Sequence, residues 1–258
     1  MWLMEPATAP RFAFYGVAML LVALAIVVIQ RYLTSRSNLR LSRNSKSETP
    51  LEKRFLAVAL SPGVGNARLQ DRYILPPSGS VLLARTEFQL DVQSLIFDTS
   101  AHIREFLPLD TDGKRVELRI PKPINGITAA HFLLNSGNSK MIYARSIIGS
   151  ISLIFRDAPP VEVELVLGYN IREWCPGNPG DYVREVSDSK NVRNAWVGMS
   201  KTGANAVIDC LTVPVFPVLR SSFLEKILFV HKSALKPPDT MGVNFSVFAI
   251  SLEIGPSA

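Results

Sequence analysis

Apolar residues occupy every second position in several short segments of this chain from residue 54 onward. In the segment 115–120, Val116, Leu118 and Ile120 alternate with three charged residues. In the segment 161–165, two valines and a leucine alternate with two glutamates. Strict alternation is typical of a β-strand that buries one face and exposes the other. This pattern therefore favours a fold built from β-strands.

Similar segments recur as far as the C-terminal end of the chain. We predict further strands at Arg54–Leu60, Ser80–Ala84, Glu87–Val92, Ile127–Leu134, Ser150–Phe155, Asn194–Met199, Ala206–Val213, Lys226–His231 and Val243–Ile254. The alternation in the last of these changes phase near Val247 and Phe248, which predicts a β-bulge there. Turn residues separate the segments, for example at Asn135–Gly137, and only Ser100–Leu107 has a short helical pattern. Many short strands separated by turns predict an all-β domain, either a sandwich or a barrel.

The segment Phe12–Gln30 has a different character, because its nineteen residues contain no charge. As a helix it would be roughly 28 Å long, which matches the ~30 Å hydrocarbon core of a bilayer. A cleaved signal peptide is the alternative. The apolar run is long for a signal peptide, and no small-residue cleavage site follows it before the charged stretch. We therefore predict a single-pass transmembrane helix at residues 12–30, preceded by an N-terminal tail at residues 1–11.

Residues 31–53 are polar, rich in serine and arginine, and contain six basic residues against two acidic ones. We predict a basic juxtamembrane linker here, followed by a β-sandwich domain at residues 54–258. The net charge of the whole chain is +6, so most of the excess lies in this linker and not on a face of the domain. This argues against a nucleic-acid partner. It favours the lipid bilayer as a partner, through anionic headgroups beside the helix.

Residues that commonly hold metals or perform catalysis do not form a recognisable constellation. His102, His131 and His231 lie in unrelated segments, without a second histidine or cysteine at ligand spacing. His131 lies in an apolar strand, where a packed and hydrogen-bonded side chain is expected. The segment Asp110–Gly113 looks like the start of a calcium loop, but Pro121 occupies the twelfth position, so a plain turn is favoured. We predict no metal, no cofactor and no enzymatic activity.

Two further sets of residues leave alternatives open. Glycoside hydrolysis requires two carboxyl groups a few ångströms apart. The candidates by residue type alone are Asp91, Glu162, Glu164, Glu173 and Asp181. Acidic residues that alternate along strands are usually solvated, so this activity remains only an alternative.

Cys175 and Cys210 are compatible either with a disulfide or with two buried free thiols.

The stretch Gly168–Trp174 and the later stretch Ala195–Gly198 combine aromatic, amide and charged residues. An aromatic ring stacks on the apolar face of a sugar, while polar side chains bind its hydroxyl groups. The candidate ligand-binding residues are Trp174, Trp196, Asn170, Arg172 and Glu173. The alternative is that the two tryptophans fill the core of the sandwich and have a structural role.

These stretches, together with His131–Leu134, resemble an HFL…GxNIREW…AWxG series. That series is found in β-sandwich modules similar to carbohydrate-binding and galactose-binding-like domains of bacterial envelope and sugar-active proteins. The resemblance spans about residues 80–254 and implies a jelly-roll-like sandwich that accompanies catalysis but does not perform it. The chain departs from the series at Cys175, where the family has a tryptophan, and in 212–217, where the family often has a tryptophan and an Asn-Pro pair. These departures weaken the expectation of sugar binding.

The leading hypothesis is thus a membrane-anchored, non-catalytic binding module for carbohydrate or another envelope component. The alternatives are a structural or assembly protein that docks an envelope protein, and a glycoside-active hydrolase. The resemblance favours an extracytoplasmic domain, whereas the basic residues after the helix favour the cytoplasmic side by the positive-inside rule. We predict an extracytoplasmic domain and keep the cytoplasmic side as the alternative.

Overall fold

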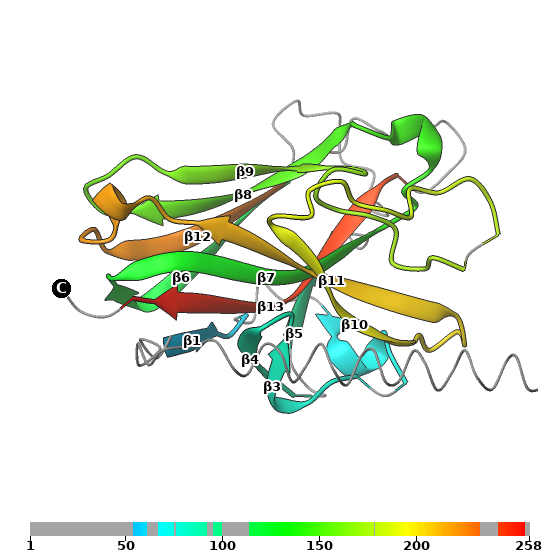
Figure 1. Cartoon of the computed structure of the whole chain (residues 1–258), viewed down its shortest axis with the longest axis horizontal. Helices are drawn as coiled ribbons and strands as arrows, with labels where there is room; N and C mark the ends of the chain where they lie inside the picture. The colour runs from blue at the N-terminus through cyan, green and yellow to red at the C-terminus, as the bar shows by residue number, and fades with distance from the viewer. Residues whose placement is uncertain are drawn as a thin grey trace, which may run out of the picture. The chain divides into compact units, whose positions relative to one another are not determined.

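The chain from residue 54 onward folds into antiparallel β-sheets, as a computed structural model shows (Figure 1). The structure describes residues 54–60, 67–74, 76–91, 95–99, 114–177, 179–232 and 242–255. The described strands are β1 (Arg54–Val58), β2 (Ala67–Arg68), β3 (Gly79–Leu83), β4 (Thr86–Leu90), β5 (Leu95–Asp98), β6 (Lys114–Ile124), β7 (Ile127–Gly137), β8 (Ile147–Phe155), β9 (Val161–Val166), β10 (Val192–Met199), β11 (Asn205–Pro214), β12 (Leu224–His231) and β13 (Asn244–Ile254). Three short 3-10 helices join them: η1 (Leu69–Asp71), η2 (Met141–Tyr143) and η3 (Pro217–Leu219). The prediction of an all-β domain is confirmed.

Two large sheets face each other as in a sandwich. A seven-stranded sheet has the order β10-β11-β7-β13-β5-β2, and β1 also pairs with β13. A four-stranded sheet has the order β6-β12-β8-β9. One hydrophobic core contains buried side chains from both sheets, including Phe132 of β7 and Phe229 of β12, whose rings meet edge to face at 6.4 Å. Alternation explains this core, because β6 turns Leu118 and Ile120 inward and leaves Arg115, Glu117 and Arg119 exposed.

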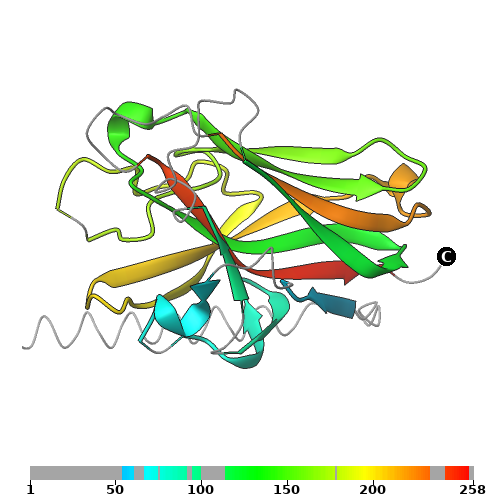
Figure 2. The same cartoon turned by 180° about the vertical axis from the view of Figure 1, so that it is seen from behind.

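The seven-stranded sheet is also covered on its other face. The β3–β4 hairpin and η1 pack there and form a second core with Phe88, Tyr73 and Phe248 (Figure 2). As a result, nearly every residue of β7 and β13 is buried. Strands buried on both faces lose the simple alternation that marks an amphipathic strand.

Most of the predicted strands are present, with small differences at their ends. The predicted bulge is confirmed, since the pairing of β13 with β7 shifts register between Val247 and Ala249. The predicted turn at Asn135–Gly137 is wrong. Those residues extend β7, because Asn135 pairs with Ser246 and Gly137 pairs with Asn244 of β13.

The predicted tail, transmembrane helix and linker, residues 1–53, lie outside the described residues. The helical segment Ser100–Leu107 and the Asp110–Gly113 turn also lie outside them. Within the part of the chain that the structure describes, no helix is long and apolar enough to cross a membrane.

Candidate functional site

A cavity of about 330 Å³ lies at one end of the seven-stranded sheet. Its lining comes from η1 and the segment after it, the end of β7, the first half of β13, the β10–β11 turn and one residue of the long loop after β9. The lining residues are Asp71, Arg72, Tyr73, Asn135, Gly137, Asn138, Trp174, Ser200, Lys201, Thr202, Asn244, Ser246 and Phe248. Amides, hydroxyl groups and aromatic rings dominate this set.

Backbone pairing brings these distant segments together. The ladder between β7 and β13 places Asn135, near the end of β7, beside Ser246. Tyr73 forms an isolated bridge with Ser200, and the Lys201 amide donates to the Arg72 carbonyl at 3.0 Å. The segment after η1 is therefore attached to the β10–β11 turn, and the cavity lies between fixed elements.

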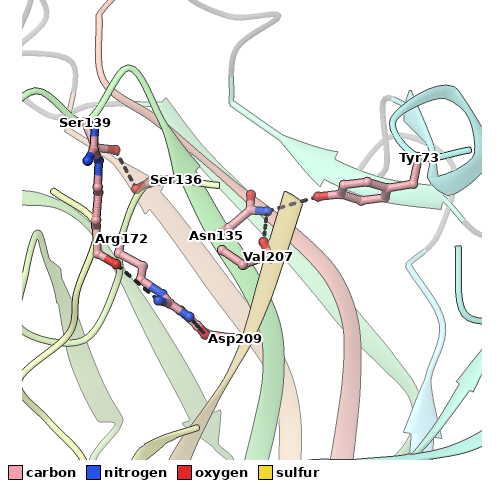
Figure 3. A network of polar contacts seen from close by, with 8 residues as sticks. Tyr73, Asn135, Ser136, Ser139, Arg172, Val207 and Asp209 are labelled. Atoms are coloured by element: carbon pink, nitrogen blue, oxygen red, sulfur yellow. Dashed lines mark hydrogen bonds and ion pairs between the residues drawn. The ribbon is translucent and has the colours of Figure 1, made fainter. Parts of the chain in front are cut away.

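Two residues of the lining, Asn135 and Tyr73, are hydrogen-bonded to each other (Figure 3). The Asn135 Nδ2 donates to the Tyr73 hydroxyl at 3.0 Å and to the Val207 carbonyl at 2.8 Å. Burial raises the pKa of Tyr73 well above its ordinary value, so its hydroxyl stays neutral. This pair thus contributes uncharged, hydrogen-bonded groups to a lining that also contains Asp71, Arg72 and Lys201.

Trp174 is the one predicted ligand-binding residue that lines the cavity. Its amide donates to the Ser136 carbonyl at 2.7 Å, and its carbonyl accepts from the Val207 amide at 2.8 Å. These bonds tie its backbone to β7 and to β11. Its half-buried side chain packs against the second core in the cavity lining.

Arg172 lies in a buried ion pair. Its Nε and Nη2 both donate to the Asp209 carboxylate at 2.7 Å, and its Nη1 donates to the Arg184 carbonyl at 3.1 Å (Figure 3). The Asp209 side chain is only 1% exposed. The guanidinium is thus engaged with the protein and fixes the 168–174 stretch to β11.

The Asn170 side chain also binds protein groups, in this case two backbone groups. Its Oδ1 accepts from the Val166 amide at 2.8 Å, and its Nδ2 donates to the Glu164 carbonyl at 2.7 Å. The side chain closes the tight turn that begins at Gly168, whose φ of 71° favours glycine.

Glu173 is fully buried next to the Ser136–Ser139 pair. Its Oε2 accepts from the Ser139 amide at 2.9 Å, and the two serine hydroxyls lie 2.6 Å apart. Burial raises the pKa of Glu173 from 4.5 to about 7, although the bonds from Ser139 oppose the shift. The Glu173 carboxyl group is therefore a buried structural group that binds the Ser139 backbone.

We expect Glu173→Gln to change how stability depends on pH. Between pH 4.5 and about 7 the folded protein binds a proton at Glu173 that the unfolded chain has lost, so the wild type loses stability as the pH rises. The variant lacks this loss. Its free energy of unfolding relative to wild type should rise by about 3 kcal/mol over this range.

Denaturant unfolding of the full chain at a series of pH values measures this difference. Glu162→Gln, on the exposed face of β9, is the matched control. A Glu173→Gln difference that stays constant with pH would contradict a raised pKa.

Trp196 is partly buried, packs against the second core and contacts the lining residue Tyr73. Its ring meets that of Tyr73 at 4.9 Å with an interplanar angle of 67°. It also covers Gly198, where an added Cβ would overlap the indole. The Trp-x-Gly spacing thus gives the ring room to lie along β10.

The five predicted residues therefore have different surroundings. Trp174 lines the cavity, Trp196 supports its wall, and Asn170, Arg172 and Glu173 bind protein groups. The sequence did not indicate Tyr73, Asn135 or Asn244, because they come from separate segments that only the strand register unites. The sequence pattern places Asn135 in a turn, whereas the structure places it in β7.

Other polar residues have structural surroundings. His131 is buried as predicted, with its Nδ1 3.0 Å from the Thr212 Oγ1 and its Nε2 3.5 Å from the Glu253 carboxylate. Cys175 and Cys210 are both free and buried, and burial raises the pKa of Cys210 to about 12. Among the described residues, no group of histidine, cysteine and acidic side chains is arranged to hold a metal ion.

Comparisons of the chain with protein-family models, curated proteins and solved structures find no match. The resemblance to carbohydrate-binding modules therefore stays a prediction.

Proposed function

We propose that this protein is a membrane-anchored, non-catalytic binding module whose ligand occupies the cavity beside Trp174. The ligand class is a neutral polyhydroxylated molecule, such as a carbohydrate of the cell envelope. The observation that carries the proposal is the lining itself. One indole lies among amide, hydroxyl and a few charged side chains, a combination that suits stacking on a sugar ring and hydrogen bonding to its hydroxyl groups.

The lining favours binding over hydrolysis. Among the described residues that line the cavity, Asp71 supplies the one carboxyl group. Its Oδ2 accepts from the Arg68 amide at 3.3 Å. Glycoside hydrolysis uses a pair of carboxyl groups, and Glu173 is buried away from solvent. Failure to hydrolyse a panel of glycosides is the expected result.

The finer architecture that we propose is a jelly roll. Its support is the strand order, in which β5-β13-β7-β11 faces β6-β12-β8-β9. In the two sheets, β12 lies between β6 and β8, and β13 lies between β5 and β7, all of which precede them in the sequence. The two Greek keys of a jelly roll have this arrangement. Jelly rolls host many functions, so this topology supports the resemblance only at the level of fold.

Anchoring rests on the uncharged segment at residues 12–30 and the basic linker after it. If the ligand is an envelope glycan, the domain must be extracytoplasmic. Protease accessibility of the full chain in sealed vesicles tests this orientation. A cytoplasmic domain would overturn the glycan ligand and leave the cavity to another polar molecule.

We expect Trp174→Ala to weaken glycan binding at least tenfold, which corresponds to about 1.4 kcal/mol, because the stacking surface is lost. Binding of the full chain in nanodiscs to a glycan array identifies the ligand, and titration of the best glycan gives the Kd. Tyr169→Ala is the matched control, since Tyr169 is an exposed aromatic residue outside the lining.

Unchanged affinity in Trp174→Ala would place the ligand elsewhere, and a wild type that binds no glycan would exclude the sugar. Asn244→Ala, which removes an amide from the lining, provides a second test of the same cavity.

The assembly alternative has one observation in its favour. Among the described strands the edge strand β10 pairs with β11 alone, and it exposes Val197 and Met199, although the Met199 carbonyl accepts from the Ile74 amide at 2.9 Å. Unpaired edges are sites where another chain adds a strand. Crosslinking that captures one stoichiometric protein partner through β10 would favour this function.

A further inference from the structure

We propose that the end of the domain opposite the cavity rests on the bilayer, through an apolar tip formed by Phe216, Val218 and Phe223 with a basic rim. The proposal depends on the proposed membrane anchor and adds an orientation and a lipid-contacting surface to it.

The tip holds its apolar side chains in solvent. Phe216 is 65% exposed and Val218 is 79% exposed, on either side of Pro217. The flanking residues Val215 and Leu219 are buried in the main core. These two anchors fix the backbone of η3, so the neighbouring side chains are pushed outward together. Exposed apolar side chains that cluster in this way commonly mark a contact surface.

Hydrogen bonds place the tip at the same end of the domain as the start of β1. The Val215 amide donates to the Thr128 carbonyl at 2.9 Å, and the Gly126 amide donates to the Arg220 carbonyl at 2.7 Å. Both bonds tie the tip to the start of β7.

Arg54, where the predicted linker ends, lies at this end too. It pairs with Ile254 of β13, and Ile254 pairs with Ile127 of β7. Figure 1 shows the start of β1, the β6–β7 turn and the end of β13 on the left side of the domain. The described chain therefore enters the domain at the end where the tip lies.

Charge at this end suits an anionic surface. Arg54, Lys122 and Arg220 are exposed there. The nearby Glu225 is paired with Arg156 at 2.6 Å, and Arg156 also lies over the Phe223 ring. Asp157, which follows Arg156 in the sequence, is also exposed. Apolar and aromatic side chains with basic neighbours are the combination that binds the interface of an anionic bilayer.

The orientation that follows directs the cavity away from the membrane. The strands β7 and β13 run from the tip to the cavity over eleven residues each. At ~3.3 Å per residue they separate the two by roughly 35 Å. A tip on the bilayer would thus present the ligand site to the space beyond the headgroups.

A probe on the full chain tests the contact. Val218→Cys is labelled with a polarity-sensitive fluorophore, and Ile142→Cys, 74% exposed in η2 near the other end of β7, is the matched control. Labelling is specific because Cys175 and Cys210 are buried. In nanodiscs that contain anionic lipid, we expect a blue shift and loss of iodide quenching at position 218 but not at 142. Adding Lys122→Glu and Arg220→Glu should reduce the shift.

Three results would overturn the contact, each in a different way. If the protein fails to co-elute with the discs, the anchor fails and the contact fails with it. If the protein co-elutes but the two probes are equally accessible to iodide, only the contact fails. If the probe at 218 shifts only after a protein fraction is added, the tip binds a protein and not the bilayer.

Discussion

Replacing Arg172 by alanine is expected to lower the free energy of unfolding by about 3–5 kcal/mol. The guanidinium donates two hydrogen bonds to Asp209, and the exposed fractions of the two side chains are 16% and 1%. Truncation leaves the Asp209 carboxylate in the interior without its counterion. The cost is that of an uncompensated buried charge, which exceeds the net contribution of the pair itself.

The chain contains a matched control for this prediction. The Arg156 Nε likewise donates to a carboxylate, that of Glu225 at 2.6 Å, but here the side chains are 51% and 39% exposed. Because water solvates the remaining partner, Arg156→Ala should leave the unfolding midpoint almost unchanged. Denaturant unfolding of the full chain in detergent compares the two variants. Equal effects would show that burial of Asp209 does not determine the cost.

A double variant separates charge from packing. Arg172→Met combined with Asp209→Leu removes both charges and keeps apolar volume at the site. It should recover most of the stability lost in Arg172→Ala, since replacing a whole buried pair is commonly close to neutral. Failure to recover would indicate that the pair is needed to hold the 168–174 stretch in place.

Replacing Phe229 by alanine is expected to cost about 3–5 kcal/mol of stability. The ring is fully buried and meets Phe132 edge to face, so it joins the four-stranded sheet to the seven-stranded sheet. The variant loses the buried apolar area of a phenyl ring and leaves a cavity that a β-sheet core cannot easily collapse. A loss of this size is a large part of the stability of a typical domain.

Phe223→Ala is the control, because Phe223 lies just before β12 and is partly exposed. It should have a much smaller effect in the same unfolding measurement. A Phe132→Ala variant and the double variant complete a mutant cycle for the ring contact. Additive losses would mean that the two rings do not interact across the sheets.

Local chemistry predicted the outer strands well and the central ones less completely. The alternation in β6 and β9 follows directly from one buried and one solvated face. Alternation predicts only one buried face, so it could not show that β7 and β13 are covered on both sides. At the end of β7, the turn preference of Asn135 and Gly137 is overridden by pairing with β13.

The candidate site was harder to predict than the fold. Trp174 was recognisable, because an aromatic residue in a polar loop suggests ligand contact. Its neighbours Tyr73, Asn135 and Asn244 are separated by dozens of residues in sequence, and only the pairing of distant strands brings them together. Arg172 and Glu173 have side chains typical of a binding site, yet their partners Asp209 and Ser139 are protein groups that the sequence pattern could not identify.

The central place of β13 has a consequence for biosynthesis. This strand, the last one described along the chain, lies between β7 on one side and both β5 and β1 on the other. None of these three strands can complete its ladder until β13, which is translated after every other described strand, has left the ribosome. Such non-local pairing makes folding slow and leaves unpaired edges exposed in the meantime. We therefore expect the nascent domain to need protection by a chaperone until β13 has been synthesised.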